Sequence, residues 1–487
     1  MKNLRLSIIM LLGIVIFTGC DDDSIFYPKV KTANGITTVS GIRAGGLEQA
    51  MLLCLGTVKH LVINDTIDSR DFETMRDDMP NLSVLDLSNA TIAAYNGYEG
   101  TAGTRVYRYP ANAIPEFAFY DPAKSKGKKS LASITFPKSI KSIRDYAFNR
   151  CTGLKGTLNI PVSVKDTIGK SAFSFCENLT GLTLSGVNYI GESAFQGCTA
   201  LAGTLVIPDS VFTIKPWAFA DCANINSISI SGTVNNISAA TFYNCGAVFS
   251  VDPVNTSYSS LEDVLFDFDK FTLIQFPKSK AGTYEVPSTV STIGAYSFAN
   301  CTALTAITVP SAVGTVEDYA FMGCTGLVGT FTISSGVSYI GQHVFDDCPN
   351  ITAFQIAPDN ITFTFADGVL VDLGQMTIKR CVQSKTGGYI VSPDISTIDN
   401  SAFSNCTMLT SVTLPEAISY IGQRAFLNCT GLTSIHMNAA APIDMRHSAT
   451  AFEGVKMGQC TLYVPIGAAT NYRNAAIWKD FVDILEN

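Results

Sequence analysis

The chain has 487 residues, a formal net charge of −8 and only 15% charged residues, whereas 47% of its residues are hydrophobic. A net negative charge gives no electrostatic attraction to nucleic acid or to an anionic membrane surface, and the hydrophobic content excludes an intrinsically disordered chain. Fourteen cysteines in a chain of this length are too dilute for the disulfide framework of a small secreted domain.

The first 19 residues have the features of an export signal. Two basic residues precede an apolar run over 6–17, which is short for a membrane span. Gly19-Cys20 resembles a bacterial lipobox, in which the cysteine is acylated and becomes the new N-terminus, although Phe17 stands where the commonest lipobox has leucine. We predict a signal peptide at 1–19 and lipidation of Cys20; a plain secretory signal is the alternative.

An acidic tract, Asp21-Asp22-Asp23, follows this cysteine directly. It resembles the tract of Bacteroidota lipoproteins that are delivered to the outer face of the outer membrane. The resemblance implies an exported cell-surface protein that contacts the membrane through its N-terminal lipid only.

Residues 20–130 are expected to form a linker and an N-terminal cap with degenerate repeats. Apolar stretches at 61–63 and 85–87 predict strands, and the segment 71–78 predicts a helix. Leu82-x-x-Leu85-x-Leu87 is itself a leucine-rich-repeat strand signature.

The central part of the chain carries ten copies of a Phe-x-x-Cys string, usually preceded by alanine. Most successive phenylalanines are 22 to 25 residues apart, which lies within the period of leucine-rich repeats. Ten of the fourteen cysteines therefore occupy one repeat position: Cys151, Cys176, Cys198, Cys222, Cys245, Cys301, Cys324, Cys348, Cys406 and Cys429.

Each copy also contains a strand signal and a turn or helix signal. Leu304-x-x-Ile307-x-Val309 predicts a short strand, and the helical spacing of Phe321 and Cys324 predicts a short helix or turn at the back of the coil. One coil cannot bury these residues alone, so stacking must align them into apolar ladders. A glycine follows the isoleucine of the turn in only five copies, so a left-handed backbone is not required there.

These motifs resemble the BspA-like leucine-rich repeat surface lipoproteins of Bacteroidota, whose coils read I-x-x-P-x-x-V-x-x-I-G-x-x-A-F-x-x-C-x-x-L. The resemblance is strong over 131–434. Together with the repeat pattern it implies an α/β repeat solenoid, a leucine-rich repeat array with short parallel strands on one face, short helices or turns on the other, and caps at both ends. It also implies adhesion to host or bacterial proteins, including matrix components.

Two intervals between phenylalanines, of 56 and 58 residues, interrupt the array near 250–285 and 355–390. Both contain apolar strands around a short polar turn, over 264–274 and 368–378, which predicts a hairpin built into a degenerate coil. Such a hairpin either packs on the array or protrudes to contact a ligand.

The last segment, 435–487, is expected to be a C-terminal cap that hides the open end of the solenoid. Its apolar residues fit one face of a terminal helix: Tyr472, Trp478, Phe481 and Ile484.

No motif in the chain indicates catalysis. There is no Cys-x-x-Cys, no His-Glu-x-x-His and no Gly-x-Ser-x-Gly string, and the four histidines lie in unrelated contexts. We predict no enzymatic activity, no cofactor, no metal site and no nucleic-acid partner.

Between the two inward positions of each strand lies one outward residue, and these residues form a mostly neutral hydroxyl column with a single carboxylate. The column is a candidate ligand-binding surface, although threonine also suits any exposed sheet. It comprises Thr135, Asn159, Thr183, Val206, Ser229, Glu285, Thr308, Thr332, Ile390 and Thr413.

Tyrosine recurs just before the isoleucine of the turn, at Tyr189, Tyr339 and Tyr420. These rings either form an aromatic stripe or cover a hydrophobic edge. They support an alternative to adhesion, in which a surface glycan-binding protein assists polysaccharide capture.

The repeat cysteines are predicted to be buried free thiols, because side chains at one ladder position point the same way. Bridges between adjacent coils are the alternative. Cys54, Cys381 and Cys460 lie off the repeat, and no pairing can be inferred for them.

Overall fold

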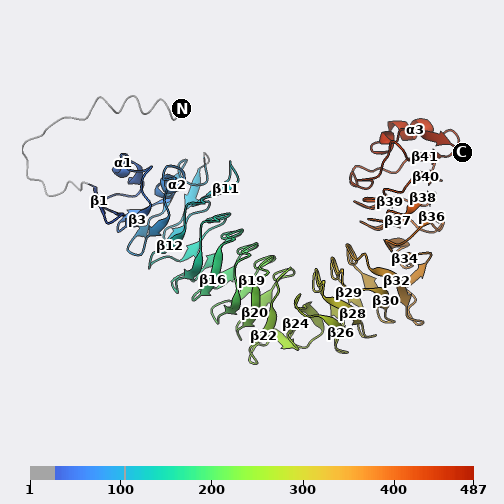
Figure 1. Cartoon of the computed structure of the whole chain (residues 1–487), viewed down its shortest axis with the longest axis horizontal. Helices are drawn as coiled ribbons and strands as arrows, with labels where there is room; N and C mark the ends of the chain where they lie inside the picture. The colour runs from blue at the N-terminus through green and yellow to red at the C-terminus, as the bar shows by residue number, and fades with distance from the viewer. Residues whose placement is uncertain (1–27, 104–105) are drawn as a thin grey trace, which may run out of the picture.

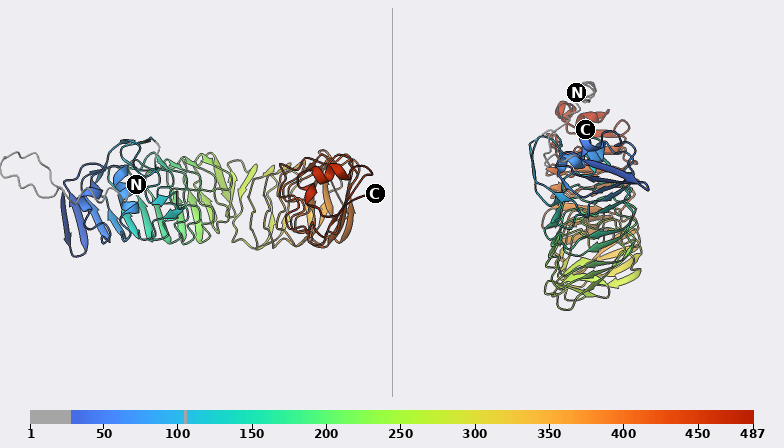
Figure 2. Two further views of the ribbon diagram at one scale, coloured as in Figure 1. Left: turned by 90° about the horizontal axis from the view of Figure 1, so that it is seen from above. Right: turned by 90° about the vertical axis from the view of Figure 1, so that its left-hand side faces the viewer.

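The computed structural model describes residues 28–103 and 106–487, so the predicted signal peptide at 1–19 and the lipidation site Cys20 lie outside the described residues. The described chain is a solenoid whose coils follow one another along an open arc (Figure 1). Seen from above the arc, the same coils form a narrow band (Figure 2). The predicted repeat solenoid with parallel strands is therefore confirmed.

Each coil contributes one long strand, one short strand and one turn segment. The long strands of the array and its C-terminal end are β12 (Ser133–Thr135), β14 (Gly156–Ile160), β16 (Leu179–Leu184), β18 (Gly203–Ile207), β20 (Ile225–Ile230), β22 (Val248–Val251), β26 (Gly282–Glu285), β28 (Leu304–Thr308), β30 (Gly329–Ile333), β32 (Ile351–Ile356), β36 (Gly387–Ile390), β38 (Leu409–Leu414), β40 (Ser434–Met437) and β41 (Thr461–Val464).

The short strands have two residues each, of which the second is buried in nearly every coil. They are β13 (Ser142–Ile143), β15 (Thr167–Ile168), β17 (Tyr189–Ile190), β19 (Thr213–Ile214), β21 (Asn236–Ile237), β27 (Thr292–Ile293), β29 (Thr315–Val316), β31 (Tyr339–Ile340), β37 (Thr397–Ile398) and β39 (Tyr420–Ile421).

The two kinds of strand pair differently along the array. Short strands β13 to β21 belong to one six-stranded sheet, whereas the long strands β14 to β32 pair only in twos and threes. In Figure 1 the long strands β28 and β38 lie nearer the outer edge of the arc than the short strands β29 and β39 of the same coils. Bending separates the coils most on the outer side, which accounts for the interrupted pairing of the long strands.

The Ala-Phe-x-x-Cys segments form turns rather than the short helices that were the other option. Each turn has two residues with positive φ, as at Tyr146 (55°) and Arg150 (56°), and a left-handed residue stops a right-handed helix. The backbone groups bond between coils instead: the Phe148 N–H donates to the carbonyl of Ala172 at 2.7 Å. Stacking therefore satisfies the hydrogen bonds that a helix would have satisfied within itself.

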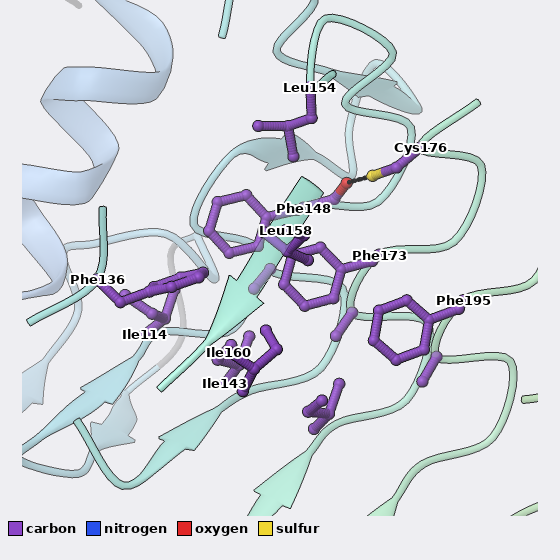
Figure 3. Packing of buried hydrophobic residues seen from close by; sticks show 14 of the residues in the cluster. Ile114, Phe136, Ile143, Phe148, Leu154, Leu158, Ile160, Phe173, Cys176 and Phe195 are labelled. Carbon is purple, nitrogen blue, oxygen red and sulfur yellow. Dashed lines mark hydrogen bonds between the residues drawn. The ribbon is translucent and has the colours of Figure 1, made fainter. Parts of the chain in front are cut away.

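Stacked phenylalanines form the centre of the core. The ring of Phe173 lies 4.9 Å from that of Phe148 and 5.4 Å from that of Phe195, nearly parallel to both (Figure 3). The repeat cysteine fills the space beside this stack, and its thiol donates to a carbonyl of the preceding coil. The Cys176 Sγ lies 3.2 Å from the Phe148 carbonyl, and the Cys198 Sγ lies 3.2 Å from the Phe173 carbonyl.

All thirteen cysteines of the described residues are free, and all except Cys54 are buried. Burial raises the pKa of Cys198 and Cys348 to about 12. We expect the native protein to react slowly with iodoacetamide at pH 8 at buried cysteines whose pKa is raised, such as Cys198 and Cys348, because only the thiolate is nucleophilic. Mass spectrometry after labelling, with and without denaturant, measures this. Rapid native labelling of Cys198, or bridges between adjacent repeats, would contradict the expectation.

Each of the two interruptions is a three-stranded antiparallel meander that enters the short-strand sheet through its last strand. The first consists of β23 (Tyr258–Leu261), β24 (Val264–Asp267) and β25 (Thr272–Gln275). The second consists of β33 (Phe363–Ala366), β34 (Val369–Asp372) and β35 (Thr377–Cys381). Corresponding residues lie 105 apart in the sequence.

A buried asparagine supports each meander in the same way. Asn255 donates to the carbonyls of Ser231 and Val234, and its own carbonyl oxygen accepts from two backbone N–H groups. Asn360, 105 residues later, donates to Ser334 and Val337 at 2.8 Å each. The shared bonds show that the interruptions are two copies of one element.

The buried apolar residues form three cores along the array: the first core spans Val39 to Leu265, the second Val264 to Val382 and the third Val369 to Ile484. The middle strand of each meander separates two of these cores. In β24, Leu265 packs into the first core, and its neighbours Val264 and Phe266 pack into the second. In β34, Leu370 belongs to the second core and Val369 to the third. Because both faces of these strands are buried, their sequences are continuously apolar rather than alternating.

The N-terminal region forms the first coils and contains two helices. Its elements are β1 (Lys29–Ala33), β2 (Ile36–Ser40), α1 (Leu47–Met51), β3 (His60–Ile63), β4 (Thr66–Ile67), α2 (Ser69–Asp77), β5 (Val84–Asp86), β6 (Thr91–Ile92), β7 (Tyr95–Gly97), β8 (Tyr107–Tyr109), β9 (Ala113–Ile114), β10 (Tyr120–Asp121) and β11 (Lys126–Gly127). Asp68 begins α2 as its N-cap, and Asp71 completes a capping box by accepting from the Asp68 N–H.

Lys128 lies at the other end of α2. Its ammonium donates to the carbonyls of Met79 at 2.7 Å and Arg76 at 3.2 Å, and the residue is only 8% exposed. Burial lowers the pKa of Lys128 to about 8.

This pKa predicts a specific pH dependence of stability. Between pH 8 and the ordinary lysine value the unfolded chain binds more protons than the folded chain, so stability rises with pH in that window and the penalty is fully present below pH 8. Relative to Lys128→Met, we expect the wild-type free energy of unfolding to increase by about 2–3 kcal/mol from pH 7 to pH 10. Urea titrations at several pH values measure this. If the unfolding free energies of wild type and Lys128→Met changed equally with pH, the assigned burial of the charge would be contradicted.

The C-terminal end contains α3 (Ala469–Asn474), a 3-10 helix η3 (Trp478–Asp480) and β42 (Ile484–Glu486). The prediction of one terminal helix is wrong: the four apolar residues are all buried but come from successive short elements. The backbone turns at Ile477, where φ is 70°, so the helix cannot continue. The Tyr472 hydroxyl donates to the Ala439 carbonyl at 2.7 Å and ties this segment to the preceding coil.

Candidate binding surfaces

The predicted column lies on the long strands, with its side chains directed outward. Most of its residues are exposed, whereas Ser229 and Thr413 are half-buried. Val206 and Ile390, the two apolar members, are 55% and 77% exposed. The column therefore offers hydroxyls, one amide, one carboxylate and two apolar side chains.

Strand register shows which column residues are neighbours. Asn159 pairs with Thr183, and Glu285 with Thr308. Thr135 instead faces Asp86 of the N-terminal region. Because the long strands pair only in short groups, the column is not one continuous surface.

The remaining pairs of the column include residues that the sequence pattern missed. Val206 pairs with Ser229, Thr332 with Gln355, and Thr413 with both Ile390 and His436. His436 stacks on Tyr463 with ring centroids 4.5 Å apart. These partners belong to coils without the full repeat motif, so only the strand register reveals them.

The three predicted tyrosines occupy the first position of short strands, on the inner side of the arc. Tyr189, Tyr339 and Tyr420 are 37%, 41% and 40% exposed. They do not contact one another along the array, because threonines hold the neighbouring positions of the ladder. The Lys215 ammonium lies over the ring of Tyr189, 5.6 Å from its centroid.

A second aromatic feature follows the turns. Its rings, here named the turn row, come mostly from the residue that precedes the Ala-Phe pair or its variant and are all half-buried: Trp217, Tyr243, Tyr296, Tyr319 and His343. Successive rings touch, with centroids 4.6 to 5.6 Å apart. For four of the five rings the sequence contains a signal, an aromatic residue or histidine at one repeat offset; Tyr243 lies outside this offset.

The turn row crosses the first interruption. The meander coil has no Ala-Phe turn, and Trp217, Tyr243 and Tyr296 close the resulting gap by edge-to-face contacts. Asn300 also donates to the Tyr243 hydroxyl at 2.8 Å.

A polar network spans the second interruption, where the meander coil also has no Ala-Phe turn. Arg380, 6% exposed, donates to Asp346 at 3.1 Å, to the Ser401 carbonyl at 2.7 Å and to the Ser404 hydroxyl at 2.8 Å. The other Asp346 oxygen lies 2.7 Å from the His343 Nδ1. One buried guanidinium thus joins the coils on both sides of the meander.

The described residues offer little for catalysis. No group of three or more potential ligands for a metal lies together in this part of the chain. A hollow of about 430 Å³ lies near the C-terminal end beside Glu416, Ile418, Ala440 and Asp444. The Asp444 carboxylate in its lining is already paired with Arg446 at 2.6 Å. None of the helices in the described ranges is long and apolar enough to cross a membrane.

A family model for the BspA type leucine-rich repeat region matches the chain over 112–248, 203–285, 275–367 and 362–449, which is more than half of its length. The chain belongs to the BspA-type leucine-rich repeat family. This membership confirms the resemblance seen in the repeat motif. No curated protein matches the chain.

Several solved structures are similar to this chain. A leucine-rich repeat protein from Eubacterium ventriosum is 23% identical, with a TM-score of 0.45, and the match covers 65% of this chain and 83% of the other. A leucine-rich cell surface protein from Faecalibacterium prausnitzii is 19% identical, with a TM-score of 0.45, over 86% and 96%. The pneumococcal vaccine antigen PcpA is 15% identical, with a TM-score of 0.39, over 94% and 96%.

Proposed function

We propose that this BspA-type repeat protein is a non-enzymatic recognition protein of the cell surface, which binds host or bacterial surface and matrix proteins. The observation that carries the proposal is the form of the array: stacked coils hold a long outer strand face, an inner short-strand face and a turn row in fixed positions. Repeat proteins use extended surfaces of this kind to bind other proteins.

The proposed place of the protein is the outer face of the outer membrane, anchored by lipid on Cys20. The apolar run over 6–17 and the acidic tract after the cysteine support this location. Metabolic labelling with a fatty acid, compared between wild type and Cys20→Ala, tests the anchor. Protease treatment of intact cells tests the surface exposure.

Binding of the purified protein to immobilised matrix proteins, to cells and to a broad protein array tests the function. We expect saturable binding to at least one protein. A matched control is the same protein with a solvent-exposed substitution away from the strand faces, such as Lys456→Gln. The absence of any protein partner across the panel would overturn the proposal.

Glycan capture is the second candidate, and the observation in its favour is the exposure of Tyr339 and Tyr420 on the inner face. Aromatic rings next to neutral hydroxyls suit an uncharged sugar better than a charged ligand. A glycan-array signal that is lost in Tyr339→Ala or Tyr420→Ala, with unchanged thermal unfolding, would favour this candidate over protein recognition.

A further inference from the structure

The C-terminal part of the turn row differs from a sugar-binding platform in how its rings are arranged. Tyr296 and Tyr319 stack with centroids 4.6 Å apart and an angle of 7°, and Tyr319 and His343 stack at 4.7 Å and 11°. Because neighbouring rings cover one another, their free parts are ring edges and hydroxyl groups. Such edges provide hydrogen-bonding groups for a ligand and no open ring face for a sugar.

Two carboxylates that have no ion-pair partner among the described residues border these rings. Glu317 and Asp318 directly precede Tyr319 in the chain, and each accepts only a backbone N–H, from Ala295 at 2.9 Å and from Gln342 at 2.8 Å. Asp318 is exposed, and Glu317 is half-buried. Each carboxylate therefore retains an oxygen for a further donor.

The basic residues of the second meander do not neutralise this charge, because both are engaged elsewhere. Lys379 is paired with Asp399 at 2.5 Å, and Arg380 is paired with Asp346 at 3.1 Å. Glu317 and Asp318 therefore keep their negative charge beside the stacked rings.

A third tyrosine lies beside the same carboxylates, because Tyr339 pairs with Thr315, two residues before Glu317. Burial and, after it, nearby charges raise the pKa of Tyr296, Tyr319 and Tyr339, and Asp318 contributes in all three cases. The pKa of Tyr296 reaches about 12. All three phenols therefore stay neutral at physiological pH and present hydroxyl groups next to a negative charge.

We propose that this patch, formed by Tyr296, Glu317, Asp318, Tyr319 and Tyr339, binds a peptide segment of a protein partner that carries arginine or lysine side chains. The proposal rests on protein recognition as the function and names the surface and the partner chemistry. A guanidinium group has several donors in one plane, which match carboxylate and phenol acceptors along one edge. Complementary charge also selects against acidic partners.

A fluorescein-labelled peptide of alternating arginine and glycine is the probe, and fluorescence polarisation measures its binding to the purified protein. We expect Glu317→Gln/Asp318→Asn to weaken binding at least tenfold. Tyr319→Phe keeps the ring stack, removes one hydroxyl and should weaken binding at least threefold. Added salt should weaken binding by wild type, because the charges are near the surface.

The whole chain is acidic, so a control must remove the same charge elsewhere. Glu177→Gln/Asp209→Asn changes two exposed carboxylates outside the patch and should alter binding less than twofold. An equal loss in this control, or wild-type binding by Tyr319→Phe, would overturn the proposal. A protein partner that binds wild type and Glu317→Gln/Asp318→Asn equally would also overturn it, while protein recognition itself would stand.

Discussion

Replacing Phe195 by alanine is expected to lower the free energy of unfolding of the first core by about 3–5 kcal/mol. The ring is fully buried between Phe173 and Phe219, 5.4 Å from each, and it is nearly parallel to both. Its removal leaves a cavity that the stacked coils on either side cannot fill, because inter-coil hydrogen bonds fix their spacing. Denaturant unfolding followed by the fluorescence of Trp217, which packs beside the break between the first and second cores, measures the effect.

Phe195→Leu is the matched control, because it keeps most of the apolar volume and should cost less than half as much. Each coil contacts mainly its neighbours, so the unfolding of the third core, reported by Trp478, should be unchanged in both variants. A cost below about 1 kcal/mol for Phe195→Ala would show that the coils close up around the gap.

Replacing Asp346 by alanine is expected to cost about 3–5 kcal/mol, because it leaves the buried guanidinium of Arg380 without its carboxylate. The Arg380 Nη2 already has no hydrogen-bond partner, so no unused acceptor is at hand to compensate. Chemical denaturation of the second and third cores measures the loss. Asp347→Asn is the control: this neighbour is exposed, and asparagine tolerates its φ of 52°.

A double-mutant cycle separates the Asp346–Arg380 interaction from the other effects of removing Asp346. Gln275 stands 105 residues before Arg380 and fills the equivalent position in the first meander, where its amide donates to the Ser297 carbonyl at 3.2 Å. In an Arg380→Gln background, Asp346→Ala should therefore cost less than about 1 kcal/mol, which gives a coupling energy of at least about 2 kcal/mol. An equal loss of unfolding free energy in both backgrounds would show that Asp346 stabilises the second interruption independently of Arg380.

The repeat motif was enough to predict the solenoid, because every copy of Ala-Phe-x-x-Cys marks the same buried position. It could not distinguish a helix from a turn. Phe148 and Cys151 have helical spacing in either case, and the deciding property is the left-handed backbone at Tyr146 and Arg150, which are neither glycine nor asparagine. Only the stacked coils provide the hydrogen bonds that make this conformation favourable.

The candidate surfaces were harder to predict for a related reason. Alternation within one strand shows which residue points outward, but it does not show which coils pair. Thr135 and Thr183 look equivalent in the repeat, yet they face Asp86 and Asn159 in different sheets. The turn row depends on contacts across about 57 residues, as between Tyr243 and Asn300, which no local pattern contains.

The glycine that follows the short-strand isoleucine shows how packing, rather than backbone freedom, selects a residue. Gly191 has an ordinary φ, as predicted, but a side chain there would lie 2.7 Å from the backbone carbon of Gly169 in the preceding coil. Coils with a larger residue at this position must therefore be spaced differently at this corner.

The strands β24 and β34, which separate the three cores, also determine how the chain unfolds under a pulling force. Three cores lie in series between the N-terminus and the C-terminal end, so each carries the same load and the weakest gives way first. Because neighbouring cores meet mainly at one meander, the collapse of one core leaves most contacts of the next intact. We therefore expect a chain that is held at both ends to lengthen in steps, one core at a time. Each unfolding step absorbs mechanical work while the remaining cores stay folded.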